Sequence, residues 1–445
     1  MFSRALLGDH REHGELAAYC DVNTTRMNYW NRYYGQELGT DPIPTYTADR
    51  FDEMIREQKI DRVIVTTVDR VHHKYICRAM ELGCDAISEK PMTTDTEKCQ
   101  QILDTTARTG KQLTVCFNYR YAPRNSKVKE LLMQGVIGQV LSVHFEWLLD
   151  TKHGADYFRR WHRDKRNSGG LMVHKSTHHF DLVNWWIGSS PKTVFAMGDL
   201  QFYGRANAEA RGETCFYNRA HGNPIAAKDP FALHMKDNEQ LKQLYLDAEH
   251  EDGYLRDQSV FGDGISIEDD MGVLVHYANK AIMTYHLTAY SPWEGYRIAF
   301  NGTKGRLEYD VTTQPYVSGT DDDHNLAHNV RGTAGHEIEE PTTILLRPHW
   351  GKIIKVELPQ TNQGGHGGGD VRLLDDVFIG GRDDTLGHTA SHVDGAMSIL
   401  TGIAANQSMA TGAAVDVDTL VQWPQDTANA SAPASERNGA TLARR

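Results

Sequence analysis

Two groups of polar side chains in this sequence have the types and spacing that proton transfer needs. The first is the triplet Glu89-Lys90-Pro91, which follows a short apolar run. A lysine there can donate to a hydroxyl or carbonyl oxygen and lower the pKa of a neighbouring acid or base. The triplet alone fits a solvated loop lysine equally well. The second group is histidine-rich and follows a pair of glycines at 169–170: His174, Lys175, His178 and His179.

The spacing within the second group predicts how its histidines are presented. The pattern over 174–187 is typical of a helix, and His174 and His178 are four residues apart. Side chains at that spacing share a helix face. Imidazole changes its charge near neutral pH, so this face suits a general base. The alternative is a set of satisfied core or surface histidines.

The elements expected over the first 120 residues alternate between strand and helix. Strands are predicted at 16–21, 62–67, 85–91 and 112–118, and helices at 71–82 and from the Thr94–Glu97 capping box to Gly110. The run at 62–67 is β-branched and uninterrupted, as in a parallel strand buried on both faces. The alternation predicts a doubly wound, Rossmann-type parallel sheet over 1–122, with its ligand at the carboxyl ends of the strands.

A different pattern follows over 123–423. Hairpins are expected within 272–291, about Asn279-Lys280, and within 296–310, about Asn301-Gly302, which predicts an open, mostly antiparallel sheet faced by helices. Residues 203–262 are charged and glycine-punctuated, as in an insertion. The tail at 424–445 is rich in Ala and Ser and is expected to be disordered.

Composition excludes several classes of function. The chain has 445 residues, which is long enough for two domains. Its net charge of −12 argues against binding to nucleic acid, which needs a basic surface. It contains neither an apolar run of membrane-spanning length nor a signal-peptide pattern. Six separate cysteines indicate free thiols in the cytoplasm. The 22 histidines show no metal-binding spacing, so no metal site is predicted.

Four segments together resemble the glucose–fructose oxidoreductase/inositol dehydrogenase (Gfo/Idh/MocA) family: residues 65–95, 117–121, 131–147 and 169–186. The resemblance runs from about residue 16 to about 420. It implies a Rossmann domain followed by an α/β domain with an open sheet. It also implies oxidation of a secondary hydroxyl of a sugar, glycoside or cyclitol by NAD, and a homo-oligomer (a dimer or tetramer) that covers the open sheet.

Roles for individual residues follow from the resemblance. Lys90 lies beside the nicotinamide and the reacting hydroxyl, and His178 takes the hydroxyl proton. The family pattern GGxxxDxGxHxxD has an acid where this chain has His174. Lys175 or an acid elsewhere would then supply the missing polar contact, and His174 joins Lys90 and His178 as a catalytic candidate.

The cofactor and substrate candidates complete the site. Asp21 ends a strand where an acid binds the ribose hydroxyls and repels a 2′-phosphate, which favours NAD over NADP; a turn-forming Asp is the alternative. The other cofactor candidates are Thr66, Thr67, His72, Glu89 and Asn118. The substrate candidates are Arg120, Tyr157, Arg160, Trp161, His162, Lys175 and His179. The loop at 364–370 lacks the context of a dinucleotide fingerprint and is expected to be a lid or a flexible connection.

Two rival functions share these residues. One is an NAD-dependent glycoside hydrolase, which would oxidise, eliminate the aglycone and reduce back, without net NADH. The other is a non-catalytic sugar-binding or regulatory relative. The first residues of the chain favour the non-catalytic relative, because residues 1–7 have the pattern of the first helix of a Rossmann domain. The innermost strand and its glycine-rich turn are therefore expected to be absent, and the affinity for the cofactor weakened.

Overall fold

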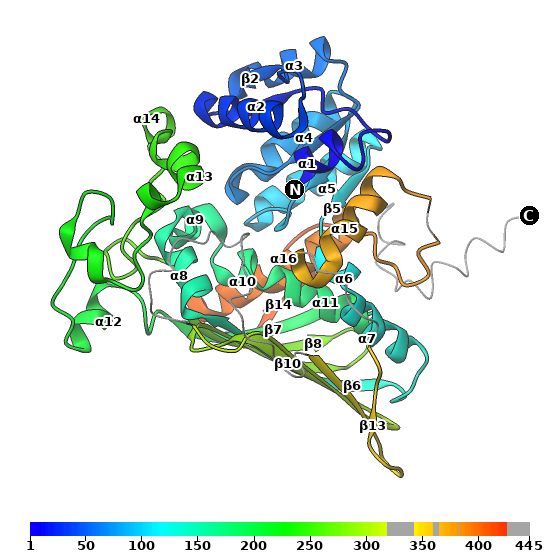
Figure 1. Ribbon diagram of the computed structural model, residues 1–445. Coiled ribbons are helices and arrows are strands. Elements are labelled where there is room, and N and C mark those ends of the chain that lie inside the picture. The colour runs from blue at the N-terminus through cyan, green and yellow to red at the C-terminus, as the bar shows by residue number, and fades with distance from the viewer. Residues whose placement is uncertain (318–341, 359–364, 382, 425–445) are drawn as a thin grey trace, which may run out of the picture.

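The computed structural model describes residues 1–317, 342–358, 365–381 and 383–424. The N-terminal residues form an α/β layer that stands over the helices of a larger region, and a broad sheet closes the far side of that region (Figure 1). Except for Pro424, the predicted tail at 424–445 lies outside the described residues.

Parallel strands and helices alternate in the N-terminal region, as predicted. The strands are β1 (Tyr19–Asp21), β2 (Thr45–Thr47), β3 (Arg62–Val65), β4 (Asp85–Ser88) and β5 (Leu113–Val115). The helices are α1 (Phe2–Leu7), α2 (Thr24–Leu38), α3 (Phe51–Glu57), α4 (His72–Glu81) and α5 (Thr96–Thr109), with 3₁₀ turns η1 (Ala48–Arg50) and η2 (Asp69–Val71).

The parallel sheet of this region is split in two. β1 pairs with β2, and β3, β4 and β5 form a separate sheet in that order. Within the described residues no strand lies between β1 and β3, which agrees with the expected absence of the innermost strand. Phe2 of α1 instead packs in a small cluster with Ile87 of β4.

One predicted helix start was wrong by a residue. The N-cap of α5 is Asp95, whose side chain accepts the Lys98 backbone N–H, instead of Thr94. Aspartate and threonine both cap helices, and here the carboxylate makes the bond. The helix ends as expected at Gly110, which adopts a left-handed conformation with φ 68°.

The second region is built on nine strands in the order β13-β12-β11-β10-β6-β9-β8-β7-β14. Their bounds are β6 (Val140–Asp150), β7 (Pro191–Asp199), β8 (Asp270–Tyr277), β9 (Ile282–Ser291), β10 (Glu294–Gly302), β11 (Gly305–Gln314), β12 (Thr342–Pro348), β13 (Ile354–Lys355) and β14 (Val415–Asp416). All pairings are antiparallel except that of β6 with β9. The second hairpin turns at Thr303-Lys304, because Asn301 is still paired with Arg306, so the predicted turn at Asn301-Gly302 was wrong.

Helices cover one face of this sheet. The segments nearest the site are α6 (Asn118–Tyr121), α7 (Pro123–Met133), α8 (Thr151–Arg159), η3 (Trp161–Arg163), α9 (Lys165–Ser168), α10 (Leu171–His174), α11 (Thr177–Ile187), α15 (Gly365–Phe378) and α16 (His392–Thr411). Strand side chains alternate between faces, and the buried set includes Phe145, Trp147 and Tyr285. These residues form the core beneath α11 and α16.

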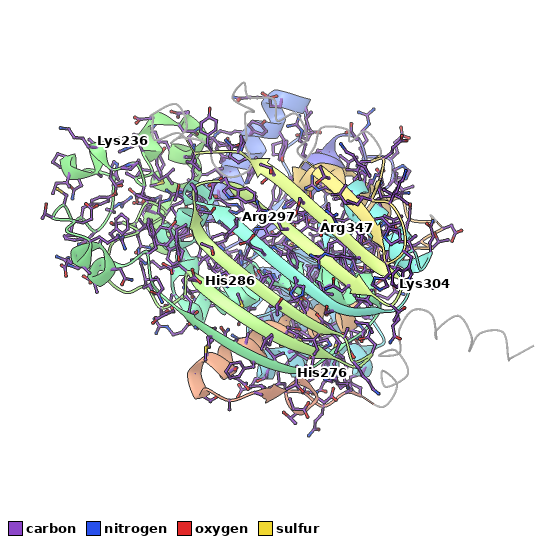
Figure 2. All side chains as sticks on the ribbon, turned by 90° about the horizontal axis from the view of Figure 1, so that it is seen from below. Lys236, His276, His286, Arg297, Lys304 and Arg347 are labelled. Atoms are coloured by element: carbon purple, nitrogen blue, oxygen red, sulfur yellow. The ribbon has the colours of Figure 1, made fainter. Side chains whose placement is uncertain are left out.

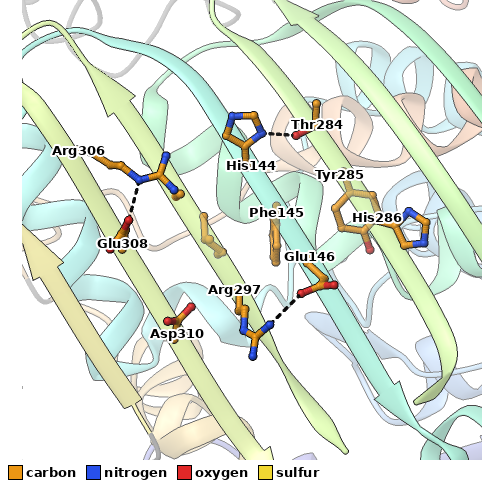
Figure 3. A pocket seen from close by; sticks show the side chains of 12 residues that line it. His144, Phe145, Glu146, Thr284, Tyr285, His286, Arg297, Arg306, Glu308 and Asp310 are labelled. Carbon is orange, nitrogen blue, oxygen red and sulfur yellow. Dashed lines mark hydrogen bonds and ion pairs between the residues drawn. The ribbon is translucent and has the colours of Figure 1, made fainter. Parts of the chain in front are cut away.

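The outer face of the sheet is charged and uncovered in the single chain (Figure 2). A shallow pocket there is bordered by His144, Glu146 and His286, with an Arg297–Glu146 ion pair at 3.8 Å (Figure 3). His144 and Glu146 flank the inward-pointing Phe145 on β6, so the pocket opens away from the helices.

Residues 203–262, predicted to be an insertion and called the insertion below, fold into short segments at one side of the sheet, coloured green in Figure 1. They are α12 (Arg205–Ala210), η4 (Pro224–Lys228), η5 (Met235–Asp237), α13 (Glu239–Leu241), the π-turn η6 (Lys242–Leu246) and α14 (Glu249–Asp252). Its last part reaches the N-terminal region and packs against α2. The insertion therefore bridges the two regions.

Candidate active site

Lys90 lies just past the carboxyl end of β4, between the two regions. Its Nζ donates to the backbone carbonyl of His174, at 3.3 Å. Burial lowers the pKa of Lys90, whereas the nearby carboxylates of Asp69 and Glu89 raise it. The ammonium is thus held against the histidine-rich segment, where it can also donate to a bound oxygen.

The predicted helix over 174–187 is broken. α10 ends at His174 and α11 begins at Thr177, so His174 and His178 belong to different helices. The prediction that they share one helical face was therefore wrong. Both side chains are still buried, but they have different neighbours.

His174 receives its acidic partner from the other region. Its Nδ1 lies 2.5 Å from Oδ2 of Asp69, which begins η2. Asp69 is almost completely buried. The chain that lacks an acid at position 174 thus pairs the replacing histidine with an acid from beyond β3. Sequence reasoning expected an acid elsewhere but did not single out Asp69.

His178 faces an aromatic wall. Its ring centroid lies 4.5 Å from that of Tyr119 and 6.2 Å from that of Phe117. Its Nδ1 is buried, and no described residue bonds to it. Burial, reinforced by the charge of Lys90, lowers the pKa of His178 well below its usual value. The ring is therefore neutral at pH 7 and can accept a proton.

A third histidine joins the site from the glycine loop. His366 lies with its ring centroid 6.0 Å from that of His178, and its Nδ1 is 2.9 Å from both Asp370 and the Asn118 amide. Gly369 lets the loop approach, since a Cβ there would lie 2.3 Å from the Asn118 carbonyl oxygen. The described part of the loop is thus packed on α6. The sequence placed His366 at the centre of a glycine loop, expected to be a lid or a flexible connection, but gave it no role in the site.

The predicted sugar-reading residues border His174. The Trp161 ring stacks on His162 at 3.6 Å, and the His162 ring lies 4.2 Å from that of His174. Arg160 pairs with Asp156 at 2.9 Å. Nδ1 of His162 is buried without a partner among the described residues. Together they form an aromatic and cationic rim beside His174.

Tyr157 is the end of a buried polar chain. Its hydroxyl lies 3.0 Å from Nε2 of His153, whose Nδ1 is 2.8 Å from Glu294 at the start of β10. The Tyr157 ring packs edge-on against His174 at 5.6 Å. Burial and the Glu294 charge raise the pKa of Tyr157 well above its usual value. Its hydroxyl therefore stays protonated and can act as a donor.

Two predicted residues lie deeper. His179 stacks on Trp147 at 3.9 Å, and its Nδ1 meets the Tyr285 hydroxyl at 2.6 Å. Lys175 places its Nζ 5.0 Å from the Trp147 ring centroid, at cation–π distance. Lys175 and His179 therefore lie at the base of the site, over the sheet.

Arg120 is not brought into this cluster. Its guanidinium is buried, forms a two-point pair with Asp181 at 2.5 and 2.8 Å, and also reaches Asp394. These contacts hold α6 to α11 and α16. The arrangement gives Arg120 a structural role beside the site.

The cofactor candidates lie along the carboxyl edge of the split sheet. Asp21 ends β1, and Thr66 and Thr67 follow β3 and are exposed. His72 is buried instead, with its ring nitrogens 2.8 and 2.9 Å from the carbonyl oxygens of Pro91 and Thr67. It thus shapes the loop of Lys90 from behind.

These residues fit the two ends of a dinucleotide. Asp21 is an acceptor for ribose hydroxyls at a strand end. Asn118 Oδ1 and His178 Nδ1 are buried polar atoms without partners among the described residues, as expected where a polar ligand binds. In the described residues, helix α1 is the only element before β1, and no glycine-rich turn accompanies it. The backbone N–H groups that would bind the pyrophosphate are therefore not among the residues that fit the dinucleotide.

Comparisons with known proteins agree with this layout. The oxidoreductase family described as an NAD-binding Rossmann fold matches residues 2–117, and its C-terminal alpha/beta domain matches 129–417. The protein named oxidoreductase YteT of Bacillus subtilis is 36% identical over 403 residues, which cover 85% of this chain and 86% of that protein.

Other relatives match over shorter stretches. The D-glucoside 3-dehydrogenase of Escherichia coli is 28% identical over 39% of this chain and 47% of its own length. A glycosyl hydrolase family 109 protein of Shewanella putrefaciens is 29% identical over 37% of this chain and 38% of its own. An Agrobacterium radiobacter oxidoreductase, solved with NAD⁺, L-tartaric acid and magnesium, shares the fold at 16% identity, with a TM-score of 0.58 over 94% of this chain and 96% of that one.

Proposed function

The chain belongs to the Gfo/Idh/MocA family of NAD-binding oxidoreductases, and from that premise we propose that it oxidises a secondary hydroxyl of a sugar, glycoside or cyclitol. The observation that carries the proposal is the site between the two regions. It combines the Lys90 ammonium with the neutral imidazole of His178, whose buried Nδ1 has no hydrogen-bond partner among the described residues. NAD supplies the hydride acceptor when bound.

Each residue has a defined task in this reaction. Lys90 donates to the substrate oxygen and stabilises the charge that develops as its proton leaves. His178 accepts that proton at a ring nitrogen. The Asp69–His174 pair holds the carbonyl that orients Lys90, so Asp69 acts as a positioning residue. Trp161 and Arg160 offer a stacking surface and a donor for the ring and its hydroxyls.

A panel of sugars, methyl glycosides and cyclitols incubated with NAD tests the proposal. NADH formation at 340 nm should rise with one substrate class and saturate with its concentration. The Lys90→Met and His178→Ala variants should lose this signal, whereas Asp52→Asn, on the exposed surface, should keep it. A folded protein that turns over none of the panel would contradict the proposal.

A second candidate is the NAD-dependent glycoside hydrolase, favoured by the family 109 relative. It needs the same residues, because oxidation precedes elimination. Nitrophenyl glycosides separate the two activities. Release of nitrophenol without net NADH favours the hydrolase, and NADH accumulation favours the dehydrogenase.

We also propose that a second copy of the chain covers the outer face of the large sheet. The face alternates acidic and basic side chains, with Arg306 and Arg347 both bonded to Glu308. Such a mixed face can pair with itself about a two-fold axis. Light scattering coupled to size exclusion should give a dimer or tetramer, and Arg297→Glu should weaken it.

We further propose a cytoplasmic location, because all six cysteines are free.

A further inference from the structure

The insertion at 203–262 ends at the place where a Rossmann domain binds the adenosine ribose. Asp21 closes β1, and α2 begins three residues later at Thr24. The Asn23 side chain donates to the Ala248 carbonyl at 2.9 Å and to Asp252 at 3.1 Å, both in the insertion. In Figure 1, α13 and α14 (green) lie beside α2 (blue). The insertion is thus part of the cofactor end of the molecule.

The side chain of Glu251, in α14, contacts the first turn of α2. Its carboxylate accepts the backbone N–H groups of Thr24 and Thr25, the latter at 2.8 Å, and the Thr25 hydroxyl. The start of a helix attracts anions through its free N–H groups and its dipole. In this chain a carboxylate of the protein already fills that anion seat.

Asp252 neutralises the nearest cation. Arg26, in the first turn of α2, forms an ion pair with Asp252 at 2.5 Å and donates from Nε to the Leu244 carbonyl at 2.9 Å. Its guanidinium also lies 5.7 and 5.6 Å from the ring centroids of Tyr245 and Tyr254. An arginine at this end of a Rossmann domain is the usual partner of the 2′-phosphate of NADP. All these contacts turn Arg26 toward the insertion.

We propose that the insertion sets the preference for NAD over NADP: Glu251 fills the anion seat at the start of α2, and Asp252 engages the arginine that would otherwise meet a 2′-phosphate. Asp21 then acts with them, since Asn23 bonds both to Asp21 and to Asp252. Three carboxylates from two separate segments thus contact the turn between β1 and α2 or the first turn of α2. The inference rests on the NAD assignment. It adds Glu251 and Asp252 to Asp21 as residues that determine the cofactor preference.

The test is a binding titration that needs no substrate. Quenching of protein fluorescence by NADH and by NADPH gives two dissociation constants for each protein. In Glu251→Gln/Asp252→Asn, both side chains keep their size and lose their charge, and Arg26 becomes available. NADPH should bind about 10–100-fold more tightly than to the unmodified chain, the scale of one charge-assisted hydrogen bond. NADH binding should change less than about threefold.

Two further variants control the result. Adding Arg26→Gln to the double variant should remove most of the gain for NADPH. Asp263→Asn makes the same kind of charge change at a side chain that is 81% exposed next to the insertion, and it should leave both constants unchanged. Thermal unfolding of each variant reports whether the fold is retained.

The outcomes separate this inference from the cofactor assignment. A double variant that binds NADH normally and rejects NADPH as strongly as the unmodified chain overturns the inference alone. A gain for NADPH that persists without Arg26 overturns the role of the Arg26–Asp252 pair. If the unmodified chain binds neither dinucleotide, the inference and the proposed function both fail.

Discussion

Asp69→Asn is the change that probes the link between the two regions of the site. Asp69 and His174 have side chains that are 4% and 11% exposed, and their atoms approach to 2.5 Å. Burial raises the pKa of Asp69 well above its usual value, against the opposing charges of Lys90 and Arg160. Asparagine keeps the size of the side chain but replaces one carboxyl oxygen by an amide, which can present N–H groups to the ring. Leaving a buried polar group without its partner costs about 1–3 kcal/mol, which corresponds to about 5–150-fold in rate.

The expected loss is in turnover, because Asp69 positions His174, whose carbonyl holds Lys90. We expect kcat to fall about 10–100-fold, and KM and NADH affinity to change less than about threefold. The assay is NADH formation at 340 nm with the best substrate of the panel, measured across pH. Asp69→Glu, which restores a carboxyl group, should recover part of the rate.

Asp52→Asn is the matched control. Its carboxylate belongs to the same region but is 42% exposed in a surface pair with Arg78, and such pairs contribute about 0–1 kcal/mol. It should retain nearly full activity. Unmodified kcat and an unmodified pH profile in a folded Asp69→Asn protein would refute the positioning role.

Further changes test the other parts of the site. His178→Ala should lower kcat about 10²–10⁴-fold with little effect on NADH binding, and rapid turnover by this variant would exclude His178 as the base. Because burial lowers the pKa of His178, its neutral form persists as the pH falls below the ordinary value of about 6.5. The acid limb of kcat/KM in the unmodified chain should therefore lie below that value, and a limb at or above it would contradict the role of His178 as the base. Asp21→Ala should narrow the gap between NADH and NADPH affinity, and tighter NADPH binding by the unmodified chain would contradict that role. Arg120→Gln should lower the free energy of unfolding by about 3–5 kcal/mol, since it leaves Asp181 buried without its cation. Calorimetry measures this loss, and a value below about 1 kcal/mol would show that the ion pair is dispensable for stability.

Local pattern predicted most of the N-terminal fold. The uninterrupted β-branched run at 62–67 correctly predicted β3, and the apolar helical pattern that ends before Gly83 correctly predicted α4. Helix and turn ends were less predictable, because Asp95 and Thr94 are both good caps and only the geometry of the folded chain selects one of them.

The site was predicted in its residue types but not in its partnerships. The glycine pair and the histidines marked the right segment, yet the break at Lys175-Ser176 separates His174 from His178. The Asp69–His174 pair joins residues 105 positions apart, and Asn118 meets His366 across 248 positions. No periodicity reports such contacts, because they depend on how the regions pack. The contacts of the insertion with α2 are hidden from sequence for the same reason.

The most direct test of the proposed chemistry is the fate of the hydrogen on the carbon that bears the reacting hydroxyl. The chosen substrate, deuterated at that carbon, is mixed with the protein and NAD for a single turnover, and the quenched nucleotide is weighed by mass spectrometry. We expect NADH one mass unit heavier, and none from His178→Ala on the same time scale. Unlabelled NADH, or oxidised sugar without labelled nucleotide, would contradict direct hydride transfer at this site.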